Sequence, residues 1–327
     1  MQVNVSVIIP FYNVSMYIDN CVKTLSEQTL KGIEFLFIDD CSTDDSLSVL
    51  ECAVASYFKD TAQVKVIKHD RNRGVSSARN TGLANASGTF IGWTDADDNI
   101  EANMFELLYN RAIEVGADIV WCDFYNSYLD RADRISQLYL EDPLVCVKGL
   151  IKGELMGALW NKLVRRSLFE KNQIHFPDGL NMCEDLRVSV QLYHSAKKVS
   201  YLPQSLYHYI KHRSNSISVR SVNSTSVNLE WVENVKGIVR FLKEEKMQGI
   251  SSDLMLLKLR PKNNLLVHGR NLTSFKQWTQ IFPEANHFIW KTKLPLYYKI
   301  LAAFAMKNIM FPIKCALFIK YKLFKRS

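Results

Sequence analysis

The 327-residue sequence lacks the cysteine patterns of disulfide-rich and zinc-binding proteins. Its seven cysteines are scattered, odd in number and without a C-x-x-C pair, which argues against a disulfide framework and a structural zinc site. The first residues, MQVNVSVIIPFYN, also lack the basic segment and long apolar core of a secretory signal. Together these absences predict a protein that works in a reducing cytoplasm.

Two glycine-rich nucleotide-binding loops are missing as well. The first predicted strand, residues 5–10, is followed neither by G-x-x-x-x-G-K-[ST] nor by G-x-G-x-x-G. Both loops hold phosphates through backbone N–H groups. If the protein binds a nucleotide, it must use other groups, and carboxylates acting through a metal ion are the remaining choice.

Long uncharged apolar runs are absent from the basic C-terminal tail. Residues 291–327 hold nine Lys and Arg and no Asp or Glu, whereas residues 1–290 hold 32 basic against 33 acidic residues. The apolar residues of the tail are interrupted by four lysines, Lys299, Lys307, Lys314 and Lys320. No uncharged run therefore reaches the roughly 18–20 residues needed to cross a bilayer. The composition predicts a tail that lies on an anionic membrane surface. Core helices with lysine stems along the surface remain an alternative, and nucleic acid is not expected because no base-stacking or helix-turn-helix motif accompanies the charge.

Short apolar runs alternate with segments of helical periodicity in the first 125 residues. Strands are predicted at 5–10, 33–39, 64–69, 89–93 and 117–124, and helices at 14–25, 44–58, 75–86 and 103–116. This alternation predicts an α/β fold with a doubly wound, mainly parallel sheet and helices on both faces. The later segments 157–169, 182–196 and 207–218 are predicted as loops and helices over a cleft, and residues 220–327 as mainly helical.

Acidic clusters follow two of the predicted strands. TDADDN, residues 94–99, places Asp95, Asp97 and Asp98 within four positions after one strand, and FIDDCSTDDS places Asp39 and Asp40 after another. Carboxylates this close raise one another's pKa, and a hard divalent cation removes that penalty. Because ligands of such sheets bind at the carboxyl ends of the strands, both clusters should meet in one cleft.

Six motifs, in this order, resemble the family 2 glycosyltransferases with the GT-A fold, especially bacterial ones that build capsule, O-antigen and exopolysaccharide. They are VSVIIPFYN, FLFIDDCSTDDS, RNRGVSSARNTGL, TDADDN, WNKLVRRSLF and CEDLRV. The resemblance covers residues 3 to about 218. It implies a GT-A-like catalytic domain at 1–218, followed by a helical region at 219–327 that ends in the tail from about 291. It also implies an inverting, metal-dependent transfer of a sugar from a nucleoside diphosphate donor, a UDP-sugar, to a glycan.

The resemblance assigns donor-binding roles residue by residue. Pro10 and Tyr12 would flank the nucleobase, and Asp40 would accept a hydrogen bond from its N–H. Asp95 would lie near the ribose and the metal, and Asp97 would ligate it directly. Such oxygen ligands suit Mg²⁺ or Mn²⁺.

The resemblance also implies the groups that act on the diphosphate and the acceptor. Arg79 matches a position near the diphosphate, although a surface helix residue is the ordinary alternative. Asp185 matches the general base of an inverting transfer, with Glu184 as the alternative base. The structural alternative for Asp185 is the N-cap of the following helix, with Glu184 favouring the helix dipole, and both roles can hold together.

A further group of residues has secondary roles, each with a structural alternative. Asp98 is either a third carboxylate of the metal segment or a helix N-cap. Trp160 could stack on a sugar or pack in the core, and Asn161 and Lys162 could bind acceptor or phosphate. Asp123 could line the acceptor pocket or be an ordinary carboxylate at a strand end.

The segment 207–218 contains His208, His212 and Arg213. Zinc hydrolysis is improbable because no H-E-x-x-H pattern is present. Arg213 is a candidate phosphate clamp. Either histidine could reach the metal or serve only the structure.

Two other functions remain open at this point, and the acceptor is a hypothesis. A nucleotidyltransferase generally carries a glycine-rich segment with a basic residue after the first strand, which is missing here. A non-catalytic nucleotide- or sugar-binding module would not need Asp185. The basic tail suggests a polyprenyl diphosphate-linked acceptor at the inner membrane face.

Overall fold

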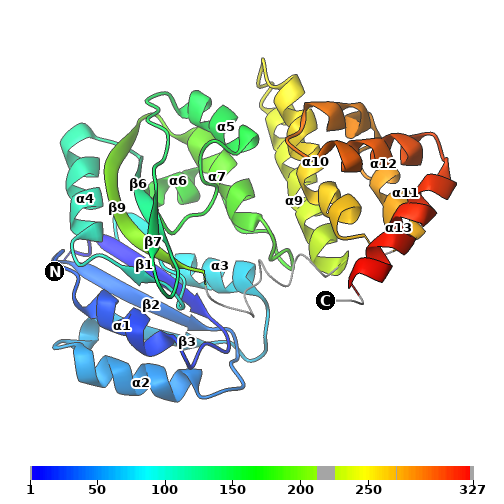
Figure 1. The fold of residues 1–327 in the computed structure, drawn as a ribbon. Coiled ribbons are helices and arrows are strands. Elements are labelled where there is room, and N and C mark those ends of the chain that lie inside the picture. The colour runs from blue at the N-terminus through cyan, green and yellow to red at the C-terminus, as the bar shows by residue number, and fades with distance from the viewer. Residues whose placement is uncertain (1, 212–224, 270, 325–327) are drawn as a thin grey trace. The chain divides into compact units, whose positions relative to one another are not determined.

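The computed structural model describes residues 2–211, 225–269 and 271–324, with the backbone alone for 225–227 and 320–324. The chain divides into two compact units, Met1–Ser214 and Asn215–Ser327. In Figure 1 the first unit is a sheet flanked by helices, and the second consists of helices.

The first unit contains nine strands in its described part. They are β1 (Val5–Phe11), β2 (Ile33–Asp39), β3 (Val64–Lys68), β4 (Phe90–Trp93), β5 (Asn99–Ile100), β6 (Ile119–Ser127), β7 (Ala132–Ile135), β8 (Lys162–Arg165) and β9 (Val199–Ile210). Its helices are α1 (Ile18–Ser26), α2 (Ser46–Tyr57), the short 3₁₀ helix η1 (Thr61–Gln63), α3 (Val75–Asn85), α4 (Met104–Val115), α5 (Pro143–Lys152), α6 (Arg166–Lys171) and α7 (Glu184–Ser195).

The strands form one mixed sheet in the order β3-β2-β1-β4-β8-β6-β9-β5, with β7 paired to β6. The half made of β3, β2, β1 and β4 is parallel throughout. In the other half β9 runs parallel to β6, while β8 lies antiparallel between β4 and β6. The expected doubly wound α/β fold is therefore confirmed, with antiparallel strands added to its second half.

Strand β1 shows how the sheet is covered on both faces. It is buried along its whole length, as is typical of a central parallel strand. Val7 and Ile9 belong to the core cluster shared with α1 and α2. Ile8 meets α3, where a Cβ on Gly82 would lie 2.3 Å from its Cγ2 atom. Only a glycine allows α3 to approach this closely, and α3 carries Arg79 into the site.

Two predictions for the later part of this unit missed a strand. Residues 157–169 and 207–218 were expected as loops and helices, but Lys162–Arg165 forms β8, and β9 extends to Ile210. Strand β8 is too short to show an alternating pattern. In β9, Pro203 lies where the register with β6 skips from Leu202 to Ser205. This irregularity lets a proline sit inside a long strand, although proline normally argues against one.

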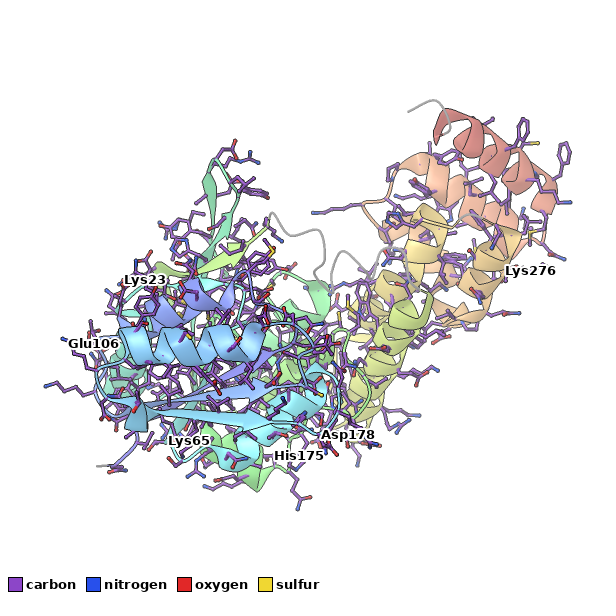
Figure 2. All side chains as sticks on the ribbon, turned by 90° about the horizontal axis from the view of Figure 1, so that it is seen from below. Lys23, Lys65, Glu106, His175, Asp178 and Lys276 are labelled. Carbon is purple, nitrogen blue, oxygen red and sulfur yellow. The ribbon has the colours of Figure 1, made fainter. Side chains whose placement is uncertain are left out.

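A buried carboxylate ties the N-terminal strands together. Glu34 of β2 accepts hydrogen bonds from Ser6 Oγ at 2.6 Å, from Ser87 N and Oγ at 2.7 Å, and from Lys65 Nζ at 2.9 Å. Lys65, on β3, is labelled in Figure 2. Burial alone would raise the pKa of Glu34, but these donors outweigh it and lower the pKa to about 2.

The low pKa of Glu34 predicts an acid-sensitive contribution to stability. Because the pKa of an unperturbed Glu is 4.5, ionised Glu34 should contribute about 3 kcal/mol above pH 4.5, lost as the pH falls towards 2. Urea unfolding between pH 7 and pH 3 checks this. Glu34→Gln should be less stable than wild type at pH 7 and lose less stability on acidification. Parallel pH curves for the two proteins would contradict the prediction.

The second unit is helical in its described part. It contains α9 (Thr225–Glu244), α10 (Ser251–Val267), α11 (Leu272–Gln280), the 3₁₀ helix η2 (Pro283–Lys291), α12 (Leu296–Met306) and α13 (Met310–Phe324). A separate hydrophobic core joins α10 to α13 around Trp278 and Phe275. Buried Lys262 is held there by Asn286 Oδ1 and by the carbonyl of Ile281 at 2.5 Å.

The basic tail forms α12 and α13 and has two kinds of apolar side chain. Leu301, Ala302, Ala305 and Ile313 are buried in the core of the second unit. Others are exposed; they are Leu296, Tyr297, Ile300, Ile309, Phe311, Phe318 and Ile319. Ordinary core helices, the alternative to membrane binding, therefore explain the buried residues of the tail but not the exposed ones. No helix in the described ranges is both long and apolar enough to span a membrane.

Candidate active site

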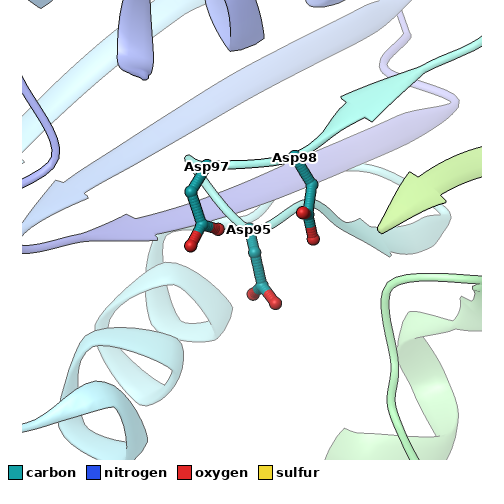
Figure 3. A group of neighbouring side chains, drawn as sticks. All are labelled: Asp95, Asp97 and Asp98. Carbon is teal, nitrogen blue, oxygen red and sulfur yellow. The ribbon is translucent and has the colours of Figure 1, made fainter. Parts of the chain in front are cut away.

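Three carboxylates gather on the loop that follows β4. Asp95, Asp97 and Asp98 each offer an oxygen, and these oxygens all lie within 4.8 Å of one another. Figure 3 shows the three side chains directed to the same side of the loop. Converging carboxylate oxygens are the donor set that Mg²⁺ and Mn²⁺ prefer. The predicted segment thus has the composition and spacing for a divalent cation.

Asp98 is buried and is held by the end of β9. Tyr207 Oη donates to Asp98 Oδ2 at 2.8 Å, and the Ile210 N–H donates to Oδ1 at 2.8 Å. The N-cap alternative for Asp98 is wrong, because α4 begins at Met104 with Asn103 as its N-cap. Burial, reinforced by the charge of Asp95, raises the pKa of Asp98 well above its usual range.

Arg79 links the acidic loop to the segment that contains the predicted base. Its guanidinium forms an ion pair with Glu184 and lies 3.7 Å from Asp95 Oδ1. Only 7% of Arg79 is exposed, so the surface-residue alternative is wrong. Burial alone would lower the pKa of Arg79, but the carboxylates of Glu184, Asp95 and Asp185 raise it. One buried cation therefore interacts with Asp95 of the acidic loop and with both candidate bases.

Glu184 and Asp185 occupy the first turn of α7. The N-cap is Cys183, in the left-handed region with φ 62°, so the N-cap alternative for Asp185 is wrong. Asp185 is half-buried, and its Oδ1 accepts from Leu186 N at 2.6 Å. Burial raises the pKa of Glu184 to about 8, although Arg79 opposes the shift. The two carboxylates thus differ in environment: Glu184 is paired and buried, whereas Asp185 is partly open to solvent.

The predicted nucleobase residues lie at the ends of β1 and β2. Tyr12 is 41% exposed, and Pro10 is buried. Asp40 Oδ1 accepts from Arg73 N at 2.8 Å and lies 2.8 Å from His69 Nδ1, while Oδ2 accepts from Gly74 N at 2.7 Å. A carboxylate has about four acceptor positions. The three bonds use most of this capacity and only 3% of Asp40 is exposed, so in this structure Asp40 chiefly anchors the loop before α3.

Trp160 packs in the core and offers no platform to a sugar in this structure. It is 5% exposed, stacks on Tyr207 with ring centroids 4.4 Å apart, and meets Phe124 edge-on at 4.8 Å. Of the two alternatives for Trp160, core packing is the one observed.

Asn161 and Lys162 are also unavailable to a ligand, contrary to expectation. Both are completely buried. Lys162 Nζ donates to Ala158 O at 2.5 Å, and to Met156 O and Asn161 Oδ1 at 2.8 Å. Asn161 Nδ2 donates to Cys122 O at 2.8 Å. The ammonium and the amide are used to fix the loop before β8.

Asp123 does not line an acceptor pocket, because it is completely buried. It accepts from Tyr201 Oη at 2.6 Å, from Gln137 N at 2.7 Å and from Arg134 at 2.9 Å. These bonds join β6, β9 and the segment after β7. Asp123 is therefore a structural carboxylate.

His208 fits the structural alternative. Its Nε2 lies 2.8 Å from Glu101 Oε1, its Nδ1 lies 3.2 Å from Ser127 Oγ, and its ring stacks on Tyr125. The other two residues predicted in this segment, His212 and Arg213, lie outside the described residues.

Two residues that contact the predicted site were missed at the level of sequence. His69 bonds Asp40, and its position at the end of a predicted strand could have revealed it. Tyr207 contacts both Asp98 and the Asp95 N–H. Its segment was expected to be a loop or helix, so no local signal pointed to it.

Comparison with known proteins identifies the family. The family model "Glycosyl transferase family 2" matches residues 6–172. The chain therefore belongs to glycosyl transferase family 2. Among its relatives, the uncharacterized glycosyltransferase EpsJ of Bacillus subtilis (strain 168) is 35% identical over 217 residues. The aligned part is 63% of this chain and 60% of EpsJ, so the chain spans less than two thirds of that relative.

Solved structures show the fold. Staphylococcus aureus TarS 1–349 in complex with UDP-GlcNAc matches with a TM-score of 0.61 and 19% identity, covering 96% of this chain and 92% of that chain. Mannosyltransferase PcManGT from Pyrobaculum calidifontis, in complex with GDP-Man and Mn²⁺, matches with a TM-score of 0.53 and 15% identity, covering 95% and 88%. The GT-A-like fold expected from the motifs is confirmed by these similarities.

Proposed function

We propose that this protein is an inverting, divalent metal-dependent glycosyltransferase that moves a sugar from a UDP-sugar to a glycan. The catalytic domain would be residues 1–218. The observation that carries the proposal is the buried Arg79, which lies 3.7 Å from Asp95 Oδ1, pairs with Glu184 and is also stabilised by the charge of Asp185. Family membership supports the same activity. The missing glycine-rich segment after β1 disfavours a nucleotidyltransferase, and a non-catalytic binding module would not need Asp185.

In the proposed reaction Asp185 is the general base. Its carboxylate accepts the proton of the acceptor hydroxyl while that oxygen attacks the anomeric carbon of the donor. The bond to the diphosphate breaks on the opposite face, and its electron pair leaves with UDP. One displacement inverts the configuration. Asp185 suits this role better than Glu184, because Glu184 is buried and paired with Arg79.

The donor end of the site would use the acids and Arg79. Asp97 and Asp95 would hold Mg²⁺ or Mn²⁺, which stabilises negative charge on the leaving diphosphate. The Mn²⁺ in PcManGT supports a metal here, and the UDP-GlcNAc in TarS supports a uridine donor. Arg79 would add positive charge beside the diphosphate, with Arg213 as a candidate clamp. Asp40 would use its remaining acceptor position for the base N–H, between Pro10 and Tyr12.

Calorimetric binding of UDP, GDP and dTDP, each with and without Mn²⁺, tests the proposal. We expect UDP to bind more tightly than GDP or dTDP, and to need Mn²⁺. Tighter binding of GDP or dTDP would change the donor but keep the mechanism. If none of the three binds, the donor site proposed here is wrong.

We further propose that the tail associates with the inner face of the cell membrane, where a polyprenyl diphosphate-linked acceptor for surface polysaccharide synthesis would lie. Helices α12 and α13 contain lysines but no acidic residue. They also carry exposed apolar side chains, among them Leu296, Ile300, Phe311 and Ile319. Apolar side chains that insert below the headgroups and lysines that meet anionic lipid are the two parts of interfacial binding.

Vesicle binding tests the tail. The double variant Leu296→Ser with Phe311→Ser should bind vesicles of phosphatidylglycerol and phosphatidylcholine at least about tenfold more weakly than wild type, because two exposed apolar side chains are lost. Leu129→Ser removes an 84% exposed leucine of the first unit and is the control. Equal binding of wild type and the double variant in sedimentation assays would count against the proposal.

A further inference from the structure

Tyr207 lies between two parts of the acidic loop. Its hydroxyl donates to Asp98 Oδ2 at 2.8 Å and accepts from the backbone N–H of Asp95 at 3.2 Å. The residue is completely buried. A single hydroxyl thus bonds the side chain of one acid and the backbone of another, three positions earlier in the loop.

The ring of Tyr207 is fixed from its other side by Trp160. The two rings stack with centroids 4.4 Å apart and planes 18° apart. Trp160 in turn stacks on Tyr209 at 5.6 Å and meets Phe124 at 4.8 Å. Tyr207 therefore has little freedom to move its hydroxyl away from the acids.

The loop that carries Trp160 is fixed as well. Buried Lys162 donates to the carbonyls of Met156 and Ala158 and to the Asn161 side chain. These bonds close the loop directly before β8. The WNKL segment takes no direct part in the proposed chemistry, but it supports Tyr207 through the stacked ring of Trp160.

We infer that Tyr207 is a positioning residue for the metal site, and that Trp160 and Lys162 hold it in place. The inference rests on the proposed function. Three neighbouring carboxylates repel one another when no cation is bound, so the loop needs bonds that keep its oxygens converged. Tyr207 supplies two of them, and the Ile210 N–H supplies a third. Groups that orient metal ligands in this way typically change metal affinity by about 10- to 100-fold when removed.

The test is Tyr207→Phe, which removes the hydroxyl and keeps the stacked ring. Mn²⁺ affinity is measured from the free-ion signal in electron paramagnetic resonance with UDP present. We expect the dissociation constant for Mn²⁺ to rise about 10- to 100-fold. In assays of transfer, the Mn²⁺ concentration for half-maximal rate should rise by a similar factor, while kcat at saturating Mn²⁺ should change little.

Tyr193→Phe is the matched control. Tyr193 is also completely buried and packs against a tryptophan, although edge-on, and its hydroxyl has no hydrogen-bond partner among the described residues. Its Mn²⁺ affinity should equal that of wild type. A second variant, Trp160→Phe, loosens the stack without touching the hydroxyl and should weaken Mn²⁺ binding less, in the same direction.

The outcomes separate this inference from the function on which it rests. If wild type binds Mn²⁺ with UDP and Tyr207→Phe binds it equally well, the positioning role is wrong and the proposed function stands. If wild type binds no Mn²⁺, both are wrong. Should Tyr207→Phe fail to fold, wild-type affinity for Mn²⁺ in Trp160→Phe would overturn the inference.

Discussion

Asp185→Asn is expected to slow glycosyl transfer by about 10²–10⁴-fold, the usual contribution of a general base. Asparagine keeps the shape of the side chain and the acceptor oxygen that bonds the Leu186 N–H, but it cannot take the proton from the acceptor hydroxyl. UDP binding in the presence of Mn²⁺ should therefore remain close to that of wild type. Initial rates with a labelled donor, together with calorimetric UDP binding, measure both quantities.

The control for this variant is Asp178→Asn. Asp178, labelled in Figure 2, is an exposed carboxylate in the segment before α7. Its replacement removes the same charge and should leave the rate within about twofold, as expected of a surface change. Full activity in Asp185→Asn would exclude Asp185 as the base. Glu184 would then have to be reconsidered, despite its ion pair with Arg79.

The second large effect is expected for Asp97→Ala. Loss of a metal ligand should abolish the Mn²⁺ dependence of UDP binding and reduce transfer by about 10³-fold, since a metal ion contributes several kcal/mol to stabilisation of the leaving group. The measurement is the calorimetric titration of UDP with and without Mn²⁺. Asp45→Ala removes an exposed carboxylate near the end of β2 that makes no capping bond, and it serves as the control.

An Asp97→Ala protein that still binds UDP only when Mn²⁺ is present would contradict the metal role of Asp97. The remaining acids, Asp95 and Asp98, would then have to hold the ion alone. If the wild-type protein binds UDP equally well with and without Mn²⁺, the proposed metal site as a whole is wrong.

Much of the first half of the fold could be predicted from the sequence because its signals are local. Strands β1, β2 and β4 are short, mainly apolar runs in the sequence, and segments with helical signals lie between them. Parallel topology then places the ends of these strands at one edge. Because β2 and β4 both run parallel to β1, Asp40 and Asp95, which follow these strands, are expected at the same edge of the sheet.

The helices of residues 220–327 were also expected. The later strands of the first unit could not be predicted in this way, because they depend on contacts between distant residues. Strand β8 has four residues and becomes a strand only by insertion between β4 and β6. The environments of Asp123 and Lys162 depend on partners that no sequence window contains. Lys162, in the WNKL motif, and Asp123, at a predicted strand end, were both considered as ligand-binding residues, whereas the structure uses both to fix loops.

The partners of Arg79 and Asp98 could not be predicted for the same reason, because they are distant in the sequence. Arg79 was recognised from its motif, but its pairing with Glu184, 105 positions later, was not. Asp98 had two plausible roles in the sequence, and its burial under Tyr207 could be seen only once β9 was known to be a strand.

The match to the family model ends at residue 172 and includes Arg79 and Asp98. Their partners lie beyond that point: Arg79 pairs with Glu184, and Asp98 accepts hydrogen bonds from Tyr207 and Ile210. A chimera that exchanges only residues 6–172 between two family members would bring in Arg79 and Asp98 without their partners. Module exchange aimed at a new donor specificity should place its junction after residue 211. Positions 98 and 207 should be transplanted together.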